Sequence, residues 1–252
     1  MRRRGYPAAA IRDFLTRVGV AKADSVVETA MLEHCVRENL NDNAHRMMAV
    51  IDPLKLIVTN YPEGKTEDIT IDNLPDGSAG SHTAPFMREL YIEREDFAID
   101  PPGKFFRLKP GGEVRLKGAY IVKCESYDTD ESGNVTAVYC TYDPATAGGE
   151  CERKIKGTLH WVPATAPAAE FRLYDDLILN ALDENDERDF TERVNPDSLI
   201  VKHGFVEPAL AAARPGDTFQ FMRVGYFCAD IQHDPAHPVF NRTVGLKDSF
   251  KL

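Results

Sequence analysis

The sequence predicts a mainly β protein that follows a short α-helical segment. Apolar residues recur at helical spacing only near the start of the chain, whereas from Arg46 onward they form short runs separated by Gly, Pro and Asn. Helical patterns do not alternate with these runs, as they would in a fold built from βαβ units. Short strands at regular intervals therefore favour barrels or sandwiches.

The composition is that of an ordinary globular protein. Of the 252 residues, 43% are hydrophobic and 28% are charged, so the chain can bury a core and form one large β domain or two smaller ones. No apolar run reaches membrane-spanning length, and no apolar signal core follows the first residues. We therefore expect a cytoplasmic protein. The arginines of residues 2–4 are expected to lie in a frayed, solvated terminus.

Two helices are predicted before the first strand. Within residues 7–18, apolar side chains recur at helical spacing behind Pro7, and Gly19 is placed to end the helix. The second helix follows a capping-box pattern formed by Ser25 and Glu28. Both helices precede the change to strand-like texture, so they form a lead-in segment.

The expected strands are spread over the rest of the chain. They are residues 47–51, 54–59, 68–71, 89–93, 134–142, 154–162, 171–179, 218–229 and 239–246. Asp130 to Asn134 is expected to be a hairpin turn because of its Gly and Asn content. Residues 170–197 contain ten acids and three bases, which predicts a solvated acidic edge that would repel a polyanion.

A basic hairpin is predicted over residues 104–123. This stretch carries six Lys and Arg residues and one acid, although the whole chain has a net charge of −10. The turn is expected at Pro110-Gly111-Gly112, and in the second arm Val114 alternates with Arg115 and Lys117, as in a half-buried strand. A solvated strand face would explain a lone alternation of this kind. The contrast in sign with the rest of the chain favours a polyanion site instead.

Many long segments, all in one order, carry a family resemblance. They read RRRGYPAAAIRDF, AVIDPLKLIVTNYP, LYIEREDF, GGEVRLKGAYIVKC, CTYDP, KGTLHWV, RLYDDL, NPDSL, FQFMRVGYFC and VFNRTVGLKDS. From its first residues to its last, the chain resembles the C-terminal, anticodon-binding half of the glutaminyl-tRNA synthetase family. The resemblance implies two antiparallel β-barrels, similar to a ribosomal-protein barrel, behind a short helical segment.

The resemblance also implies a division into four segments. They are a helical connecting segment (1–45), the first part of a proximal barrel (46–98), a distal barrel (99–194) and the returning part of the proximal barrel (195–252). In this family the distal barrel is inserted within the proximal one. The last strands of the chain are therefore expected to complete the barrel that the first strands begin.

The family attaches glutamine to its tRNA with ATP and magnesium, using a catalytic half whose motifs the printed sequence lacks. It contains no HIGH-type sequence, no KMSKS-type loop and no Gly-rich phosphate cradle, and its five cysteines form no C-x-x-C pair. We expect no cofactor, metal or catalytic site in this chain and no activity by it alone. The expected partner is tRNA(Gln), which would bind through its anticodon loop. We expect the protein to be a monomer that does not associate with a membrane.

Three site residues follow from matched motifs for the central anticodon base. Arg46 in NAHRMMAV and Gln220 and Arg223 in FQFMR match the family residues that enclose a central uridine. A Gln amide both donates and accepts, as the edge of uracil does, and Arg can add a carbonyl or phosphate contact. Without the resemblance, Gln220 would be interpreted as a polar position on a strand.

Three further site residues match the outer anticodon bases. Arg107 matches the residue for a third-position guanine, whose O6 and N7 both accept hydrogen bonds. Arg115 matches a contact to the first base, and Lys117 stands where the family often has Arg, so it keeps the charge without the planar fork. Phe106, where a basic residue can occur, is expected to pack into the barrel more readily than to stack on a base.

Two other functions are consistent with parts of this pattern. A glutamyl-tRNA synthetase of the type that shares these barrels reads a closely related anticodon, but its segments should match less closely. A non-enzymatic β-barrel that binds other RNA or a protein would share the fold and the basic stretch alone. The number and order of the matched segments favour the glutaminyl family.

Overall fold

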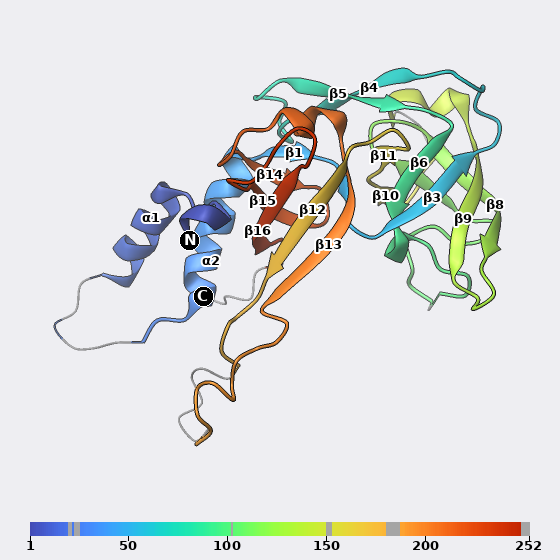
Figure 1. Ribbon diagram of the computed structural model, residues 1–252. Helices are drawn as coiled ribbons and strands as arrows, with labels where there is room; N and C mark the ends of the chain where they lie inside the picture. Colours follow the sequence, from blue (N-terminus) through green and yellow to red (C-terminus); the bar gives the residue numbers. More distant parts are fainter. Residues whose placement is uncertain (20–21, 23–25, 102, 150–152, 180–186, 248–252) are drawn as a thin grey trace.

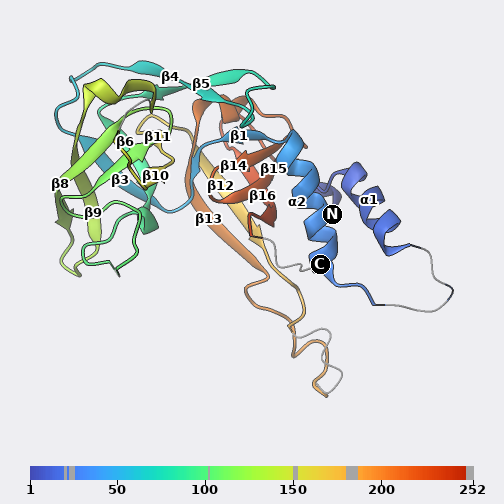
Figure 2. The ribbon, with the colours of Figure 1, turned by 180° about the vertical axis from the view of Figure 1, so that it is seen from behind.

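The computed structural model describes residues 1–19, 22, 26–101, 103–149, 153–179 and 187–247. It confirms a mainly β fold with two helices at the N-terminus. Figure 1 shows the helices at one end, followed by two barrel-like sheets. A two-stranded ribbon, formed by β4 (Glu67–Asp72) and β5 (Ser81–Phe86), runs over both sheets. The view from behind in Figure 2 shows the same order.

Sheet A, the sheet next to the helices, has the strand order β1-β14-β15-β16-β12-β13-β2. Its strands are β1 (His45–Met47), β2 (Ala49–Val50), β12 (Ala168–Tyr174), β13 (Leu199–Val206), β14 (Thr218–Phe221), β15 (Gly225–Ala229) and β16 (Val239–Gly245). The two edge strands follow each other in the chain, so the sheet curls toward closure. Its core is rich in phenylalanine, and the ring centroids of Phe221 and Phe227 are 4.6 Å apart.

Sheet B has the strand order β10-β7-β8-β9-β3-β6-β11. Its strands are β3 (Pro53–Val58), β6 (Glu89–Glu93), β7 (Glu113–Leu116), β8 (Ile121–Thr129), β9 (Val135–Tyr142), β10 (Thr158–Leu159) and β11 (Val162–Pro163). Here too the two edge strands are consecutive in the chain, which brings the edges together. Trp161, between them, is fully buried and packs edge-on against Phe86 of the ribbon.

Sheet B is inserted in the chain between two parts of sheet A. Residues 53–163 supply the strands of sheet B, whereas sheet A uses residues 45–50 and 168–245. The predicted boundaries after residues 98 and 194 do not coincide with these changes of sheet. The reason is that β3 and β6 pair with β9 and β11, while β12 pairs with β13 and β16.

Both predicted helices are present. α1 (Ala8–Val18) is followed by Gly19, whose positive φ of 73° is a conformation that glycine adopts readily, so the helix ends there as predicted. α2 (Thr29–Asn43) begins later than the capping-box pattern indicates. Glu28, expected inside the first turn, is instead the residue that precedes the helix, and Ser25 lies outside the described residues. In the described ranges, no helix has the length and apolar character needed to cross a bilayer.

Two of the arginines near the N-terminus, Arg3 and Arg4, are held by contacts to sheet A and the segment after β15, which corrects the prediction of a frayed end. They lie in a 3-10 helix, η1 (Arg2–Arg4), in which Arg3 Nε lies 2.7 Å from Oδ2 of the fully buried Asp230. Burial acts to raise the pKa of Asp230, but hydrogen bonds from Arg3 and Asn241 outweigh it and hold the pKa well below its ordinary value. The terminus is therefore part of the face of sheet A.

The basic hairpin predicted over residues 104–123 is wrong in its first arm, which forms no strand. The hairpin that does form joins β7 to β8 around Gly118, where φ is 70°. A Cβ at Gly118 would lie 2.5 Å from Cδ1 of Ile71 in the ribbon, so backbone conformation and packing both require glycine there. The alternation predicted for the second arm stops at Leu116, where the strand ends. Ala119, which that alternation places on the same face as Arg115 and Lys117, is buried.

Two strands have no counterpart in the prediction. β5 (Ser81–Phe86) pairs with β4 (Glu67–Asp72) to form the ribbon, and it contains Pro85, a residue typical of loops. The first five residues of β13 are all exposed, so they show no alternation. Both strands therefore lack the pattern on which the prediction depends.

Other predicted elements agree with the structure or are shorter. The turn between Asp130 and Asn134 joins β8 to β9, as predicted. The run 218–229 is split by a turn at residues 222–224, and the run 154–162 forms strand only near its end. The remaining 3-10 helices are η2 (Arg94–Asp96), η3 (Pro144–Gly149) and η4 (Pro208–Ala212).

Candidate nucleic-acid interface

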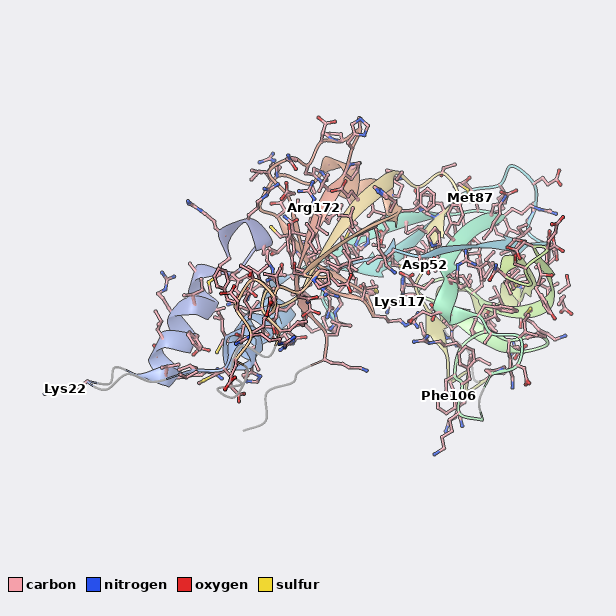
Figure 3. The ribbon with its side chains drawn as sticks, turned by 60° about the horizontal axis from the view of Figure 1, so that its bottom comes forward. Lys22, Asp52, Met87, Phe106, Lys117 and Arg172 are labelled. Atoms are coloured by element: carbon pink, nitrogen blue, oxygen red, sulfur yellow. The ribbon has the colours of Figure 1, made fainter. Side chains whose placement is uncertain are left out.

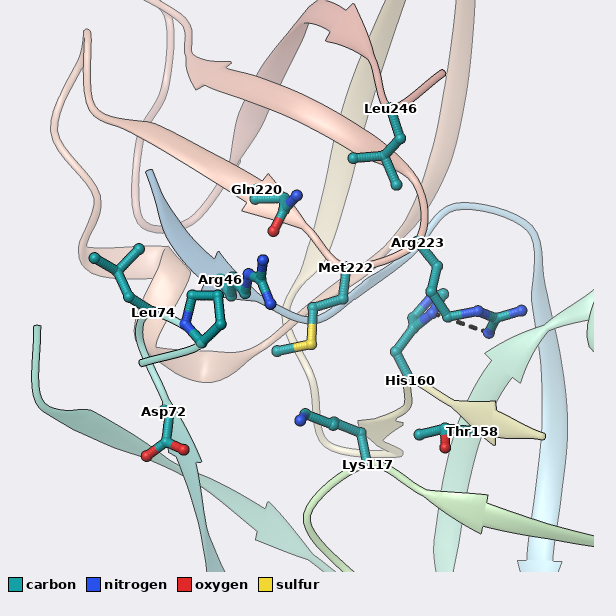
Figure 4. Close-up of a pocket in the computed structure, with 11 residues that line it drawn as sticks. Arg46, Asp72, Leu74, Lys117, Thr158, His160, Gln220, Met222, Arg223 and Leu246 are labelled. Atoms are coloured by element: carbon teal, nitrogen blue, oxygen red, sulfur yellow. Dashed lines mark hydrogen bonds between the residues drawn. The ribbon is translucent and has the colours of Figure 1, made fainter. Parts of the chain in front are cut away.

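A pocket lies where sheet A, sheet B and the ribbon meet. Its volume is about 540 Å³, and Figure 4 shows side chains from all three parts around it. Four of the six predicted site residues line it: Arg46, Lys117, Gln220 and Arg223. Arg46, Lys117 and the pair Gln220 and Arg223 come from three distant parts of the sequence, so the pocket depends on how the two sheets sit against each other.

Arg46 and Gln220 form one wall of the pocket. They are direct partners in the parallel pair of β1 and β14. Gln220 Nε2 donates a hydrogen bond to the hydroxyl of Tyr226 (3.1 Å), and Figure 4 shows Oε1 on the side facing Arg46. Arg46 Nε is buried and has no hydrogen-bond partner among the described residues. An unpaired buried donor costs about 1–3 kcal/mol, so an acceptor on a ligand would be stabilised here.

Arg223 occupies the turn between β14 and β15. Both of its terminal nitrogens donate to Asp96, with Nη1 2.6 Å from Oδ2. Burial acts to lower the pKa of Arg223, but the hydrogen bonds and charge of Asp96 outweigh it and raise the pKa above its ordinary value. The guanidinium remains charged and its side chain is 31% exposed, so it is available to a ligand.

Arg107 does not line this pocket but contacts the same aspartate. Its Nε lies 3.3 Å from Asp96 Oδ1, and its Nη2 lies 3.0 Å from the exposed carboxylate of Glu95. Its Nη1 donates to the backbone carbonyl of Glu95 (2.9 Å). The structure thus brings Arg107 and Arg223 together through Asp96, although they come from segments that precede β7 and follow β14.

Arg115 and Lys117 come from the β7–β8 hairpin. Lys117 lies at the pocket in the turn after β7, and in Figure 3 it projects on the side of sheet A. Arg115 is outside the pocket, and its Nη1 is buried without a hydrogen-bond partner among the described residues. Phe106 is 53% exposed, with Lys156 Nζ 5.2 Å from its ring centroid, so the expected packing into the barrel is wrong.

Several residues in the pocket or directly behind it were missed by sequence reasoning. Asp96 is an acid in the charged run EREDF, which is typical of a solvated surface, and only its burial reveals it. His160 is buried between the sheets, with Nδ1 3.3 Å from Arg223 Nη1. Asp72, Leu74 and Pro75 reach the pocket from the ribbon. Pro75 lies in a stretch interpreted as a loop, and no pattern in it indicates a binding wall.

Two family models match most of the chain. Both are described as "tRNA synthetases class I (E and Q), anti-codon binding domain"; one matches residues 44–143 and the other residues 158–230. The chain belongs to this family. The two matched regions together hold all six predicted site residues.

Curated relatives of this anticodon-binding family match over the full chain. A glutamine–tRNA ligase of Clostridium perfringens is 54% identical over 100% of this chain and 47% of its own length. Glutamine–tRNA ligases of Bradyrhizobium diazoefficiens and Alteromonas mediterranea are each 51% identical over 99% of this chain. The chain spans about half the length of the curated relatives it matches.

An anticodon-binding domain implies tRNA as its partner, and the pocket has suitable chemistry. Its cationic residues can contact phosphates, while Gln220 offers a fixed acceptor for a base edge. The acids of residues 170–197 that the structure describes lie mainly on the arm beyond β12, which extends away from the ribbon in Figure 1. Positive and negative surfaces are thus separated, which favours one orientation of a bound polyanion.

Proposed function

We propose that this chain binds the anticodon loop of tRNA(Gln) as part of a glutamine–tRNA ligase. The observation that carries the proposal is the pocket between the sheets, where Arg46, Gln220 and Arg223 surround one space and Lys117 lies beside it. Anticodon bases are single-stranded and can be splayed out, so their Watson–Crick edges can enter such a pocket.

The central uridine would occupy this pocket. Tyr226 holds the amide of Gln220 so that Oε1 is the group offered to a ligand, and this oxygen can accept from N3–H of uracil. Arg46 Nε, buried without a partner among the described residues, can donate to a uracil carbonyl. Cytosine has an acceptor in place of N3–H, so the same arrangement would disfavour it.

The outer anticodon bases would lie beside this pocket. Arg107 would donate to O6 and N7 of a third-position guanine, displacing the exposed carboxylate of Glu95 from its Nη2. Arg115 would contact the first base from β7. Lys117, with a flexible ammonium, would hold either that base or a phosphate near the pocket.

The whole protein would attach glutamine to tRNA(Gln) with ATP and magnesium. The printed name of the relatives, glutamine–tRNA ligase, supports this activity. We place catalysis in the part of those relatives that this chain does not span, so the chain alone should bind tRNA as a monomer without charging it. We also propose a cytoplasmic location, which the buried free thiols Cys35, Cys124, Cys140 and Cys228 support.

Binding of labelled tRNA transcripts to the purified chain tests the proposal. The set contains tRNA(Gln), three versions with one anticodon base changed, and tRNA(Glu). We expect tRNA(Gln) to bind best, with each changed base costing about 1–3 kcal/mol, and we expect affinity to fall steeply with salt because phosphate contacts release counterions. Equal affinity for all five transcripts would contradict the proposal, and so would charging of tRNA(Gln) by this chain with ATP.

A further inference from the structure

Asp96 is a buried carboxylate held between two of the proposed base-binding arginines. Its side chain is 0% exposed, and both of its oxygens accept from the terminal nitrogens of Arg223. One of these oxygens, Oδ1, also lies 3.3 Å from Arg107 Nε. Among the described residues, Asp96 thus joins an arginine of the sheet B segment to one of sheet A.

The position of Asp96 is fixed by its own backbone. Its carbonyl accepts from Leu108 N (2.9 Å), and the next residue, Phe97, forms a bridge with Leu108. Asp96 therefore lies on a short segment that is tied directly to the residue after Arg107. The backbone of Asp96 therefore keeps a fixed position relative to the segment that carries Arg107.

Arg223 is held in a backbone conformation that few residues adopt. Its φ of 66° is the single positive value for a residue other than glycine in the part of the chain that the structure describes. This conformation costs about 1–2 kcal/mol for most residues, and such strain persists where surrounding contacts over-determine it. The two hydrogen bonds to Asp96 supply such contacts, and they direct the guanidinium across to sheet B.

Asp96 cannot bind the RNA itself. Its side chain is fully buried, both of its oxygens already accept from Arg223, and its charge opposes a phosphate. The two arginines, by contrast, are 35% and 31% exposed, so each can present the remaining edge of its fork to a ligand. Any effect of Asp96 on RNA binding would therefore be exerted through Arg107 and Arg223.

We infer that Asp96 is a positioning residue that sets the geometry of Arg107 and Arg223 together, and so couples recognition of the third anticodon base to recognition of the central one. This inference rests on the proposed function. Since one carboxylate orients both forks, loss of the carboxylate should reduce discrimination at both bases. Loss of either arginine should disturb the base that the other arginine contacts.

The test compares Asp96→Asn with Asp52→Asn. Asp52 is 54% exposed and pairs with Arg94 at 3.3 Å, so its substitution removes the same unit of charge from this region without touching either base-binding arginine. Affinities are measured for tRNA(Gln) and for transcripts with a changed central or third base, at two salt concentrations. Thermal unfolding of each variant checks the fold.

We expect Asp96→Asn to reduce discrimination about tenfold at both bases, the size of one good base contact, and to leave the salt dependence unchanged. Asp52→Asn should keep wild-type discrimination at both. A loss confined to one base, or retained discrimination at both, would overturn the inference. If the wild-type chain itself does not discriminate, the proposed function and this inference both fail, and that result is distinct from a failure of the Asp96 variant alone.

A second variant decides the matter if Asp96→Asn does not fold. Arg223→Ala changes a half-exposed residue proposed to contact only the central base, yet coupling through Asp96 predicts at least a severalfold loss at the third base as well. The double variant Arg107→Ala/Arg223→Ala should lose less at the third base than the two single losses combined. Unchanged third-base discrimination in Arg223→Ala would show that the arginines act independently.

Discussion

Gln220 and Tyr226 are direct partners across β14 and β15, and the amide of the first donates to the hydroxyl of the second over 3.1 Å. Tyr226 is buried, and burial raises the pKa of its hydroxyl above the ordinary value, so the hydroxyl stays protonated across the physiological range. In this arrangement the NH₂ of the Gln220 amide is turned to Tyr226, and Oε1 is turned toward Arg46. If Gln220 contacts uridine as proposed, we expect Tyr226 to influence the specificity of that contact.

Tyr226→Phe removes only this hydroxyl. We expect the amide to lose its fixed orientation, so that its NH₂ can also face the pocket and donate to cytosine N3. Discrimination between uridine and cytidine at the central position should fall severalfold, with a smaller change in affinity for tRNA(Gln). Competition between the two transcripts measures this. Tyr139→Phe, which removes a hydroxyl bonded to Asp128 in sheet B, is the control and should change neither affinity.

Arg107→Ala and Lys109→Ala separate base recognition from charge. Arg107→Ala should cost about 1–3 kcal/mol for tRNA(Gln) and much less for a transcript with another third base, because a donor fork aimed at O6 and N7 carries sequence information. Lys109 is exposed on the same loop and should affect both transcripts alike or not at all. Four binding titrations provide the comparison. Equal losses for Arg107→Ala on both transcripts would mean that this arginine contacts only the backbone.

Gly118→Ala and Gly133→Ala separate packing from backbone strain. Both glycines have positive φ, 70° and 82°, so both substitutions incur a conformational cost of about 1 kcal/mol. Only at Gly118 would the new Cβ meet a neighbour, 2.5 Å from Cδ1 of Ile71. Urea unfolding should show a clearly larger loss of stability for Gly118→Ala. Similar losses would indicate that the ribbon moves away without cost.

The stability of the protein should depend on Cys228 at alkaline pH. Burial raises the pKa of this thiol from an ordinary 9.0 to about 11. The folded state therefore keeps the proton longer than the unfolded state, so the stabilisation is complete below pH 9.0 and is lost as the pH rises through about 11. Unfolding free energies measured across this range should decline less steeply in Cys228→Ala than in the wild type. An unchanged slope would contradict this assignment.

Local elements could be predicted because short-range signals determine them. α1 ends at its glycine, and the turn between Asp130 and Asn134 closes where its composition indicates. The hairpin over residues 104–123 shows where such signals fail. Pro110-Gly111-Gly112 does form a turn, as predicted, but the residues before it form no strand. The strand after it pairs instead across a second turn at Gly118, which packs against Ile71, a residue distant in the sequence. β13 begins with the apolar run Leu199-Ile200-Val201, which is exposed on both faces and therefore shows no alternation.

The candidate site could be predicted only through family motifs. Arg46 and Gln220 become neighbours because β1 pairs with β14, and no local periodicity contains that information. Asp96 was missed because an acid in a charged run is usually solvated, whereas here it is enclosed by two arginines. Contacts that depend on the position of one sheet against the other appear only once both are folded.

The insertion of sheet B into the chain of sheet A has a consequence for synthesis on the ribosome. Residues 53–163 emerge together, so sheet B can fold while the chain is still growing. β1 and β2 must wait for β14 and β13, more than a hundred residues later, and such non-local pairing is slow. We therefore expect nascent chains that end near residue 165 to protect sheet B from protease while β1 and β2 stay accessible. The pocket between the two sheets would then be the last part of the molecule to form.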